Sequence, residues 1–197
     1  MPQKTMPHAR LDPRRPLVLD ARELGRRPGS MRPVRRTVPA PADLALGLAR
    51  VPEGEPVELD LRMESAVEGV LVSGTVSAPV AGECGRCLEP FGDDVTVDVL
   101  ELFAYPGSTT DGSADDGEVS RMAGDLLDLE PVVRDAVVLA LPLAPVCDED
   151  CRGLCATCGA RLDELPADHS HETLDPRWAA LTERFGTQPG SSDSQES

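Results

Sequence analysis

Eight potential metal ligands, six cysteines and two histidines, occur in three short clusters of this 197-residue chain. The ligands are Cys84 and Cys87, then Cys147, Cys151, Cys155 and Cys158, then His169 and His171. Four is the coordination number of structural zinc, and Cys and His are its usual protein ligands. The residue types therefore predict a metal-stabilised module that holds at least one Zn²⁺ ion and has enough ligands for two.

The spacing leaves open which ligands share an ion. One partition joins Cys84 and Cys87 to Cys147 and Cys151, and then joins Cys155 and Cys158 to His169 and His171. A second partition uses Cys147, Cys151, Cys155 and Cys158 alone. A third joins Cys84 and Cys87 to Cys155 and Cys158, because two Cys-x-x-Cys pairs from distant parts of a chain can complete one tetrahedral site.

A thiol redox centre is the main chemical alternative for Cys84 and Cys87. Oxidoreductase Cys-x-x-Cys pairs place the first cysteine at a helix N-terminus, where the helix dipole lowers its pKa. Leu88-Glu89-Pro90 predicts no helix here. Structural zinc sites are coordinatively closed, and the sequence has no phosphate-binding glycine loop and no Gly-x-Ser-x-Gly elbow. We therefore expect no enzymatic activity and no small-molecule substrate.

Charge is divided unevenly along the chain. Residues 1–50 hold 11 basic and 4 acidic residues, a net of +7, whereas residues 51–197 hold 8 basic and 31 acidic residues, a net of −23. A basic arm on an acidic body is typical of a protein with charged partners.

The expected location is the cytoplasm. No segment reaches the roughly 18 uninterrupted apolar residues that span a bilayer, so no membrane partner is expected. Residues 1–15 lack the apolar region of a secretory signal. Cytoplasmic thiols are kept reduced, which favours metal binding over disulfides.

Alternating residues predict a β-meander in the first half of the chain. Residues 57–63 alternate between apolar and charged side chains, the period-2 signature of a half-buried strand. A second strand is predicted over 67–80 and a third over 95–103, with Cys84 and Cys87 in the turn between them. The short connections favour antiparallel pairing.

Shorter elements surround this meander. Further strands are predicted at 17–19 and 34–38 and helices at 42–49, 131–141 and 175–186, while 126–129 fits either type. The predicted fold is α+β, an antiparallel β-meander or small barrel with a few packed helices and a Cys-rich zinc-binding C-terminal segment. We divide the chain into a disordered basic arm (1–15), a mainly-β part (16–105), an acidic flexible loop (106–118), a helical and zinc-knuckle part of the same domain (119–186) and a disordered tail (187–197).

Four stretches carry a family resemblance. They are Glu-Cys-Gly-Arg-Cys-Leu-Glu-Pro-Phe at 83–91, Leu-Ala-Leu-Pro-Leu-Ala-Pro-Val-Cys at 139–147, Cys-Arg-Gly-Leu-Cys-Ala-Thr-Cys-Gly-Ala-Arg-Leu at 151–162 and Asp-Pro-Arg-Trp-Ala-Ala-Leu at 175–181. In these motifs, and over roughly residues 15–185, the chain resembles the YceD family of large ribosomal RNA subunit accumulation proteins. Many members carry Cys-x-Cys where this chain has His169-Ser170-His171, a replacement that keeps two ligands.

The resemblance implies a bacterial, metal-binding factor in ribosome biogenesis. Such a factor would support the synthesis, processing or stability of large-subunit ribosomal RNA. The partners that it implies are this RNA or a pre-ribosomal particle, because nucleic-acid binding is proposed for the family. Some members lack the later cysteines, so the metal could serve function or only local stability.

Arginines near the N-terminus are the candidates for an RNA contact. They are Arg22, Arg26, Arg27, Arg32, Arg35 and Arg36. They could pair with phosphates and give a salt-dependent affinity for RNA. Residues 1–50 contain no Phe, Trp or Tyr on which bases could stack. Alternatively, the arginines fold back on the acidic body or are simply solvated. A separate hypothesis is an acidic chaperone or adaptor for a basic ribosomal protein, since an acidic surface attracts a basic client.

Overall fold

The structure, a computed structural model, describes residues 11–113 and 119–171. The chain divides into two compact units, unit 1 (Met1–Arg152) and unit 2 (Gly153–Ser197). The helix predicted at 175–186 and the tail at 187–197 lie outside the described residues, as do most of the predicted arm and part of the predicted 106–118 loop.

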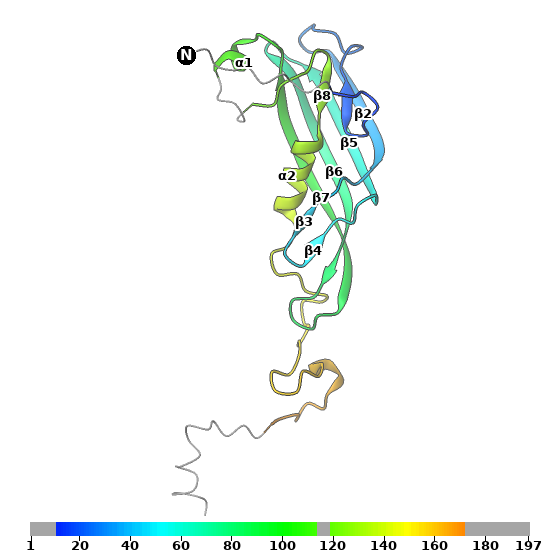
Figure 1. The fold of residues 1–197 in the computed structure, drawn as a ribbon, viewed down its shortest axis with the longest axis vertical. Coiled ribbons are helices and arrows are strands. Elements are labelled where there is room, and N and C mark those ends of the chain that lie inside the picture. Colours follow the sequence, from blue (N-terminus) through cyan, green and yellow to red (C-terminus); the bar gives the residue numbers. More distant parts are fainter. Residues whose placement is uncertain (1–10, 114–118, 172–197) are drawn as a thin grey trace, which may run out of the picture. The chain divides into compact units, whose positions relative to one another are not determined.

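An antiparallel sheet dominates unit 1 (Figure 1). Its long strands lie in the order β2 (Met31–Pro39), β5 (Pro56–Ser65), β6 (Gly69–Glu83) and β7 (Pro90–Ala104). The predicted meander is therefore confirmed, and β6 and β7 form a hairpin of 15 residues on each side. The tip of this hairpin carries Cys84 and Cys87.

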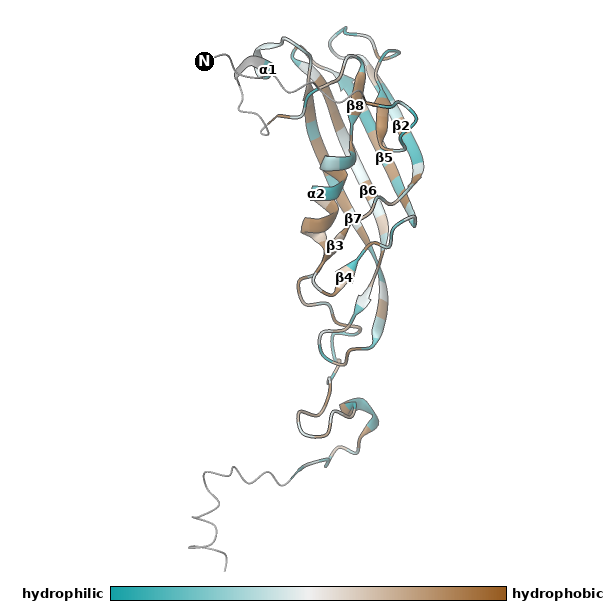
Figure 2. Cartoon of the chain, viewed as in Figure 1, coloured by the Kyte–Doolittle hydropathy of each residue, from teal (hydrophilic) through white to brown (hydrophobic). Residues whose placement is uncertain are grey.

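Alternation along the strands separates the two faces of the sheet. In β5 the side chains of Val57, Leu59, Leu61 and Met63 are at most 2% exposed, while the polar residues between them face solvent. Successive side chains of a strand point to opposite faces, so the brown and teal bands alternate along the sheet in Figure 2. One face of the sheet is consequently a core face and the other a polar, open face.

Three elements contribute apolar residues to the core. β1 (Val18–Asp20) pairs with β8 (Leu126–Asp128), and α2 (Glu130–Ala140) follows directly. Leu19, Leu127, Val133 and Val137 belong to the same buried cluster as the inner face of the sheet. Helix α2 confirms the prediction for 131–141, with a proline in its first turn, where the lost N–H has no helical partner.

The helix predicted at 42–49 is wrong. This segment forms β3 (Ala45–Leu46) and β4 (Ala49–Arg50), joined through Gly47 at φ 59°. Ala49 and Arg50 pair with the β6 backbone, so tertiary pairing overrides the helical preference of an Ala/Leu-rich segment. Within the predicted 106–118 loop, Thr109–Ser113 forms the short helix α1.

The fold is richer in β-structure than an α+β mixture. Among the described residues α2, with 11 residues, is the one helix longer than about a turn and a half. The strands β2 and β7 do not pair with each other in the described part of the chain, so the barrel alternative is not confirmed. No described helix is long and apolar enough to cross a membrane.

Replacing Phe103 by Ala should destabilise unit 1 by about 3–5 kcal/mol, because the ring is 1% exposed and its loss leaves a cavity. The matched control is Leu100→Ala, since Leu100 lies on the same strand but is 71% exposed. We expect this control to change stability by less than about 0.5 kcal/mol. Urea denaturation measures both, and equal losses in the two variants would contradict the assignment of faces.

Candidate metal centres

Site 1 lies in unit 1, where the tip of the β6–β7 hairpin meets the segment after α2. Cys84 and Cys87 come from the tip, and Cys147 and Cys151 come from the segment that begins at Pro142. The four sulfur atoms all lie within 4.8 Å of one another. Three of these cysteines are buried and Cys147 is exposed.

The spacing of these sulfur atoms fits a tetrahedral ion. Cys84 Sγ lies 3.8 Å from Cys151 Sγ, and Cys87 Sγ lies 3.6 Å from Cys147 Sγ. A zinc ion with Zn–S bonds of about 2.3 Å sets a sulfur–sulfur edge of about 3.8 Å. A disulfide would need about 2.0 Å, and all six cysteines are free. The arrangement is therefore that of a metal site and not of a pair of disulfides.

Hydrogen bonds from the Arg86 side chain connect the hairpin tip to the segment that supplies the other two cysteines of site 1. Its guanidinium donates to the carbonyl oxygens of Glu149 and Cys151, each at 2.9 Å. The Gly85 N–H donates to the Pro145 carbonyl at 2.7 Å. This role of Arg86 could not be predicted, because nothing in the residue pattern reports a contact across more than 60 residues.

Site 2 lies in unit 2 and takes all of its ligands from that unit. Cys155, Cys158, His169 and His171 bring one ligand atom each to within 4.8 Å of one another. Cys158 Sγ lies 3.6 Å from His169 Nε2, and the two Nε2 atoms lie 2.9 Å apart. For Zn²⁺ the corresponding edges are about 3.5 Å and about 3.3 Å. The sulfur–nitrogen distance fits, whereas the imidazoles must separate by a few tenths of an ångström to bind one ion.

The two Cys-x-x-Cys turns share one backbone structure, which we call a knuckle (Cys84–Glu89 and Cys155–Ala160). In each, the first cysteine N–H donates to the carbonyl five residues later, at 2.8 Å. The N–H four residues after that cysteine donates back to it, at 2.8–2.9 Å. The residue that makes this second bond has a positive φ, 63° at Leu88 and 72° at Gly159.

The knuckles also favour the thiolate form of their first cysteine. The backbone N–H of Cys87 is the main cause that lowers the pKa of Cys84 to about 6. In the other knuckle, the backbone N–H of Cys158 is the main cause that lowers the pKa of Cys155 to about 6. Hydrogen bonds to the thiol of Cys87, and then of Cys151, raise the pKa of Cys147 to about 12. Each site thus offers one thiolate at neutral pH, while Cys147 must give up a proton to bind a cation.

The grouping agrees with the first of the three partitions. Cys84 and Cys87 meet Cys147 and Cys151, and neither rival set of four cysteines forms one of the groups found among the described residues. Two clusters could therefore hold one metal ion each, which is the arrangement that two zinc ions would need. That these residues bind metal stays a prediction.

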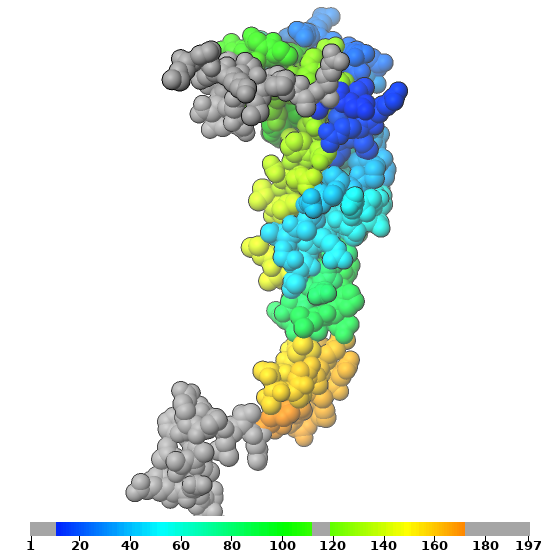
Figure 3. All heavy atoms as spheres, in the orientation of Figure 1, coloured from blue at the N-terminus to red at the C-terminus, as the bar shows by residue number. Residues whose placement is uncertain are grey.

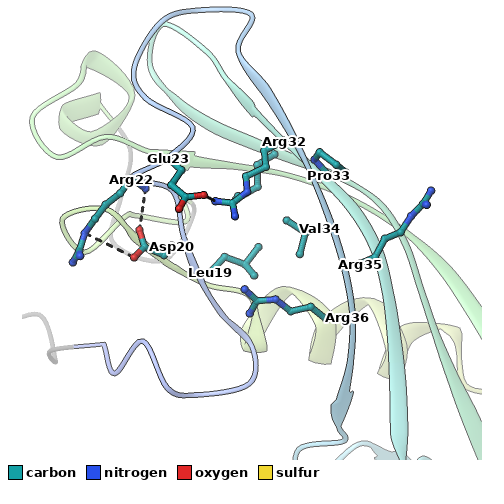
Figure 4. Close-up of a pocket in the computed structure, with 10 residues that line it drawn as sticks. Leu19, Asp20, Arg22, Glu23, Arg32, Pro33, Val34, Arg35 and Arg36 are labelled. Atoms are coloured by element: carbon teal, nitrogen blue, oxygen red, sulfur yellow. Dashed lines mark hydrogen bonds and ion pairs between the residues drawn. The ribbon is translucent and has the colours of Figure 1, made fainter.

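Four of the six candidate RNA-binding arginines, Arg22, Arg32, Arg35 and Arg36, line a pocket of about 480 Å³ (Figure 4). Arg32 and Arg36 point into this pocket and Arg35 points away from it. Alternate residues of β2 face the same side, and Val34 between Arg32 and Arg36 is buried. Arg32 and Arg36 lie on the same face of β2, and both therefore point into the pocket.

Four of the six arginines have a partner within the protein. The pairs are Arg22 with Asp20 and Asp125 (3.8 and 3.7 Å), Arg32 with Glu23 (2.7 Å), Arg35 with Asp60 (3.1 Å), and Arg26 over the Tyr105 ring (4.9 Å). Within the described residues Arg27 and Arg36 make no ion pair or hydrogen bond through their side chains. Two of the six, Arg22 and Arg35, thus pair with carboxylates of the acidic body, Asp125 and Asp60, whereas Arg32 pairs with Glu23 of the first 50 residues.

Single cysteine variants should separate the two sites. Because each site takes its ligands from one unit, Cys87→Ser should remove one zinc ion and leave site 2 loaded, and Cys158→Ser should do the reverse. Native mass spectrometry of each variant, and of the double variant, counts the ions per chain. Loss of the same ion in both single variants would instead support the partition that joins the two Cys-x-x-Cys pairs.

Comparison with known proteins places the chain in one family. Residues 72–183 match the family described as "Large ribosomal RNA subunit accumulation protein YceD". An uncharacterized protein of Mycobacterium tuberculosis is 50% identical over 171 residues, 87% of this chain and 82% of the relative. An uncharacterized protein of Mycobacterium leprae is 45% identical over 168 residues, 85% of this chain and 77% of the relative.

A more distant relative carries a functional name. The "Large ribosomal RNA subunit accumulation protein YCED homolog 1, chloroplastic" of Arabidopsis thaliana is 23% identical over 160 residues, 66% of this chain and 49% of the relative. No solved structure matches the chain. Since the matched region includes both Cys-x-x-Cys knuckles and more than half of the sequence, the chain belongs to the YceD family.

Proposed function

We propose that this protein is a non-enzymatic zinc-binding factor in ribosome biogenesis, which supports the accumulation of large-subunit ribosomal RNA. The observation that carries the proposal is the family match over residues 72–183, which spans both predicted metal sites. The Arabidopsis relative bears the same functional name.

The donor set supports zinc as the metal. Four sulfur atoms, or two sulfur and two imidazole nitrogen atoms, in a tetrahedral arrangement are typical of zinc and of iron–sulfur clusters. The histidine pair in site 2 favours zinc, because most iron–sulfur clusters are held by cysteines alone. A site with four protein ligands has no open position for substrate, which supports a structural role and not a catalytic one.

Deletion of the gene in its own host tests the function. We expect the ratio of large- to small-subunit ribosomal RNA to fall, and the wild-type protein to restore it. Cys87→Ser should restore it less well, since site 1 joins the hairpin tip to the segment after α2. RNA gel analysis of the strains measures the ratio, and an unchanged ratio in the deletion strain would exclude the proposed function.

A second candidate concerns the way in which the protein acts. An acidic adaptor would bind a basic ribosomal protein and need not touch RNA. The ion pairs of Arg22, Arg32 and Arg35 favour this candidate, because RNA phosphates would compete with carboxylates that already neutralise these side chains. Exposed pairs are weak, on the order of 0–1 kcal/mol each, so an experiment must decide.

The variant Arg26→Ala/Arg27→Ala/Arg35→Ala/Arg36→Ala separates the two modes of action. As an adaptor, the protein should show the same affinity for large-subunit ribosomal RNA at low salt with or without these arginines. If the arginines bind phosphates, the salt slope of binding should fall by about 1 for each arginine–phosphate pair that the variant removes. The control variant is Arg134→Ala, because Arg134 lies on α2 and bonds to Ala42 and Glu130. A steep drop in affinity confined to the quadruple variant would exclude the adaptor without RNA contact.

A further inference from the structure

Leu88 occupies a position where the knuckle requires an unusual backbone. Its φ is 63°, and its side chain is 59% exposed. A left-handed backbone costs a leucine about 1–2 kcal/mol, and an exposed leucine side chain gains nothing from burial that would offset this cost. The matching residue of the second knuckle is Gly159, which adopts φ 72° without that strain. The hydrogen bonds of the knuckle therefore do not need a leucine, and its side chain requires another explanation.

Three other exposed leucines lie in the segments around Leu88. Leu48 joins β3 to β4, while Leu139 lies in the last turn of α2 and Leu143 follows it. Their exposed fractions are 41%, 84% and 82%, respectively. We call these three residues and Leu88 the leucine surface.

Backbone contacts bring these segments together. The Glu83 N–H donates to the Leu48 carbonyl at 3.1 Å, and the Gly85 N–H donates to the Pro145 carbonyl at 2.7 Å. A Cβ atom at position 85 would lie 3.9 Å from Leu48 Cδ1, so the Leu48 side chain is close to the hairpin tip. The β3–β4 turn, the hairpin tip and the segment after α2 are adjoining light-blue, green and yellow atoms in Figure 3. Of the seven large apolar side chains that are exposed in the described chain, four belong to this surface.

Acidic residues outnumber basic ones in the segments that hold Leu88 and Leu143. Residues 81–94 and 142–152 contain seven acidic and two basic residues. One of the two basic residues is Arg86, whose guanidinium is held by the Glu149 and Cys151 carbonyls. Four thiolates around one divalent ion would add further negative charge at site 1. We call the seven carboxylates the acidic rim: Glu83, Glu89, Asp93, Asp94, Asp148, Glu149 and Asp150.

We propose that the leucine surface is a docking site for a basic polypeptide segment. Apolar side chains of the segment contact the leucines, and its Lys or Arg residues face the acidic rim. This proposal deepens the adaptor mode of the proposed function and rests on it for the class of partner. Charge complementarity selects the polypeptide over RNA, because the rim repels phosphates and leucine offers no ring on which a base can stack.

The variant Leu88→Gly tests the site without disturbing the knuckle. Glycine keeps the backbone conformation, so zinc content and melting temperature should stay equal or rise. The probes are large-subunit ribosomal proteins of the host, stripped of RNA and purified individually. We expect at least one basic protein to bind the zinc-loaded full chain, and Leu88→Gly to weaken that binding at least about tenfold.

Two further variants define the surface. Leu48→Ala/Leu143→Ala should weaken binding of the same protein to a similar degree. Leu100→Ala removes an exposed leucine on the outer face of β7, outside the leucine surface, and should leave the affinity unchanged. A photoreactive residue at position 88 should cross-link in cells to a segment of that protein in which apolar residues are flanked by Lys or Arg.

Several outcomes would overturn the docking site. These are no binding by any of the purified proteins, equal affinity of wild type and Leu88→Gly, cross-links from position 88 to RNA, and a dimer of this chain that Leu88→Gly dissociates. Complementation distinguishes this failure from failure of the proposed function. If the deletion strain lacks large-subunit RNA and Leu88→Gly restores it fully, the docking site is wrong and the function stands.

Discussion

The convergence of four potential ligand atoms on one point recurs in both units. In unit 1 the β6–β7 hairpin extends to a tip where Cys84 and Cys87 meet Cys147 and Cys151, and these sulfur atoms take the place of a hydrophobic core. In unit 2 the described residues 153–171 add no side chain to the buried apolar cluster. A unit of this size without a core needs a metal or cross-links to hold one conformation.

The two knuckles have the same backbone structure although their sequences differ. Both use the same pair of hydrogen bonds and the same left-handed residue, and both lower the pKa of their first cysteine. They differ in the side chain at that left-handed position, which is absent in Gly159 and exposed in Leu88. The shared backbone geometry explains the glycine but not the leucine, and the proposed docking site would explain the leucine.

Alternation along residues 57–63 was enough to predict β5 and the meander, because a half-buried strand must alternate. The sequence also marked the cysteines and the two histidines as candidate ligands, and the structure gathers them into two groups of four. The choice among the three ligand partitions could not be predicted, because the spacing of residues along the chain does not show which distant loops meet. The β3–β4 hairpin was not predicted either, because its strand structure comes from pairing with Gly82 and Ala81 of the distant strand β6.

The structure shows which of the basic residues pair with carboxylates, and the sequence alone did not. Part of the basic charge of the first quarter is paired within the protein, because β2 pairs with β5 and sets Arg35 beside Asp60, while Arg32 reaches Glu23. An excess of acidic residues lies around site 1, where the exposed leucines also gather. An excess of negative charge disfavours phosphates and favours basic groups, which is why we propose a basic polypeptide as the partner. A metal ion at site 1 would thus fix both the hairpin tip and the surface proposed to bind a partner.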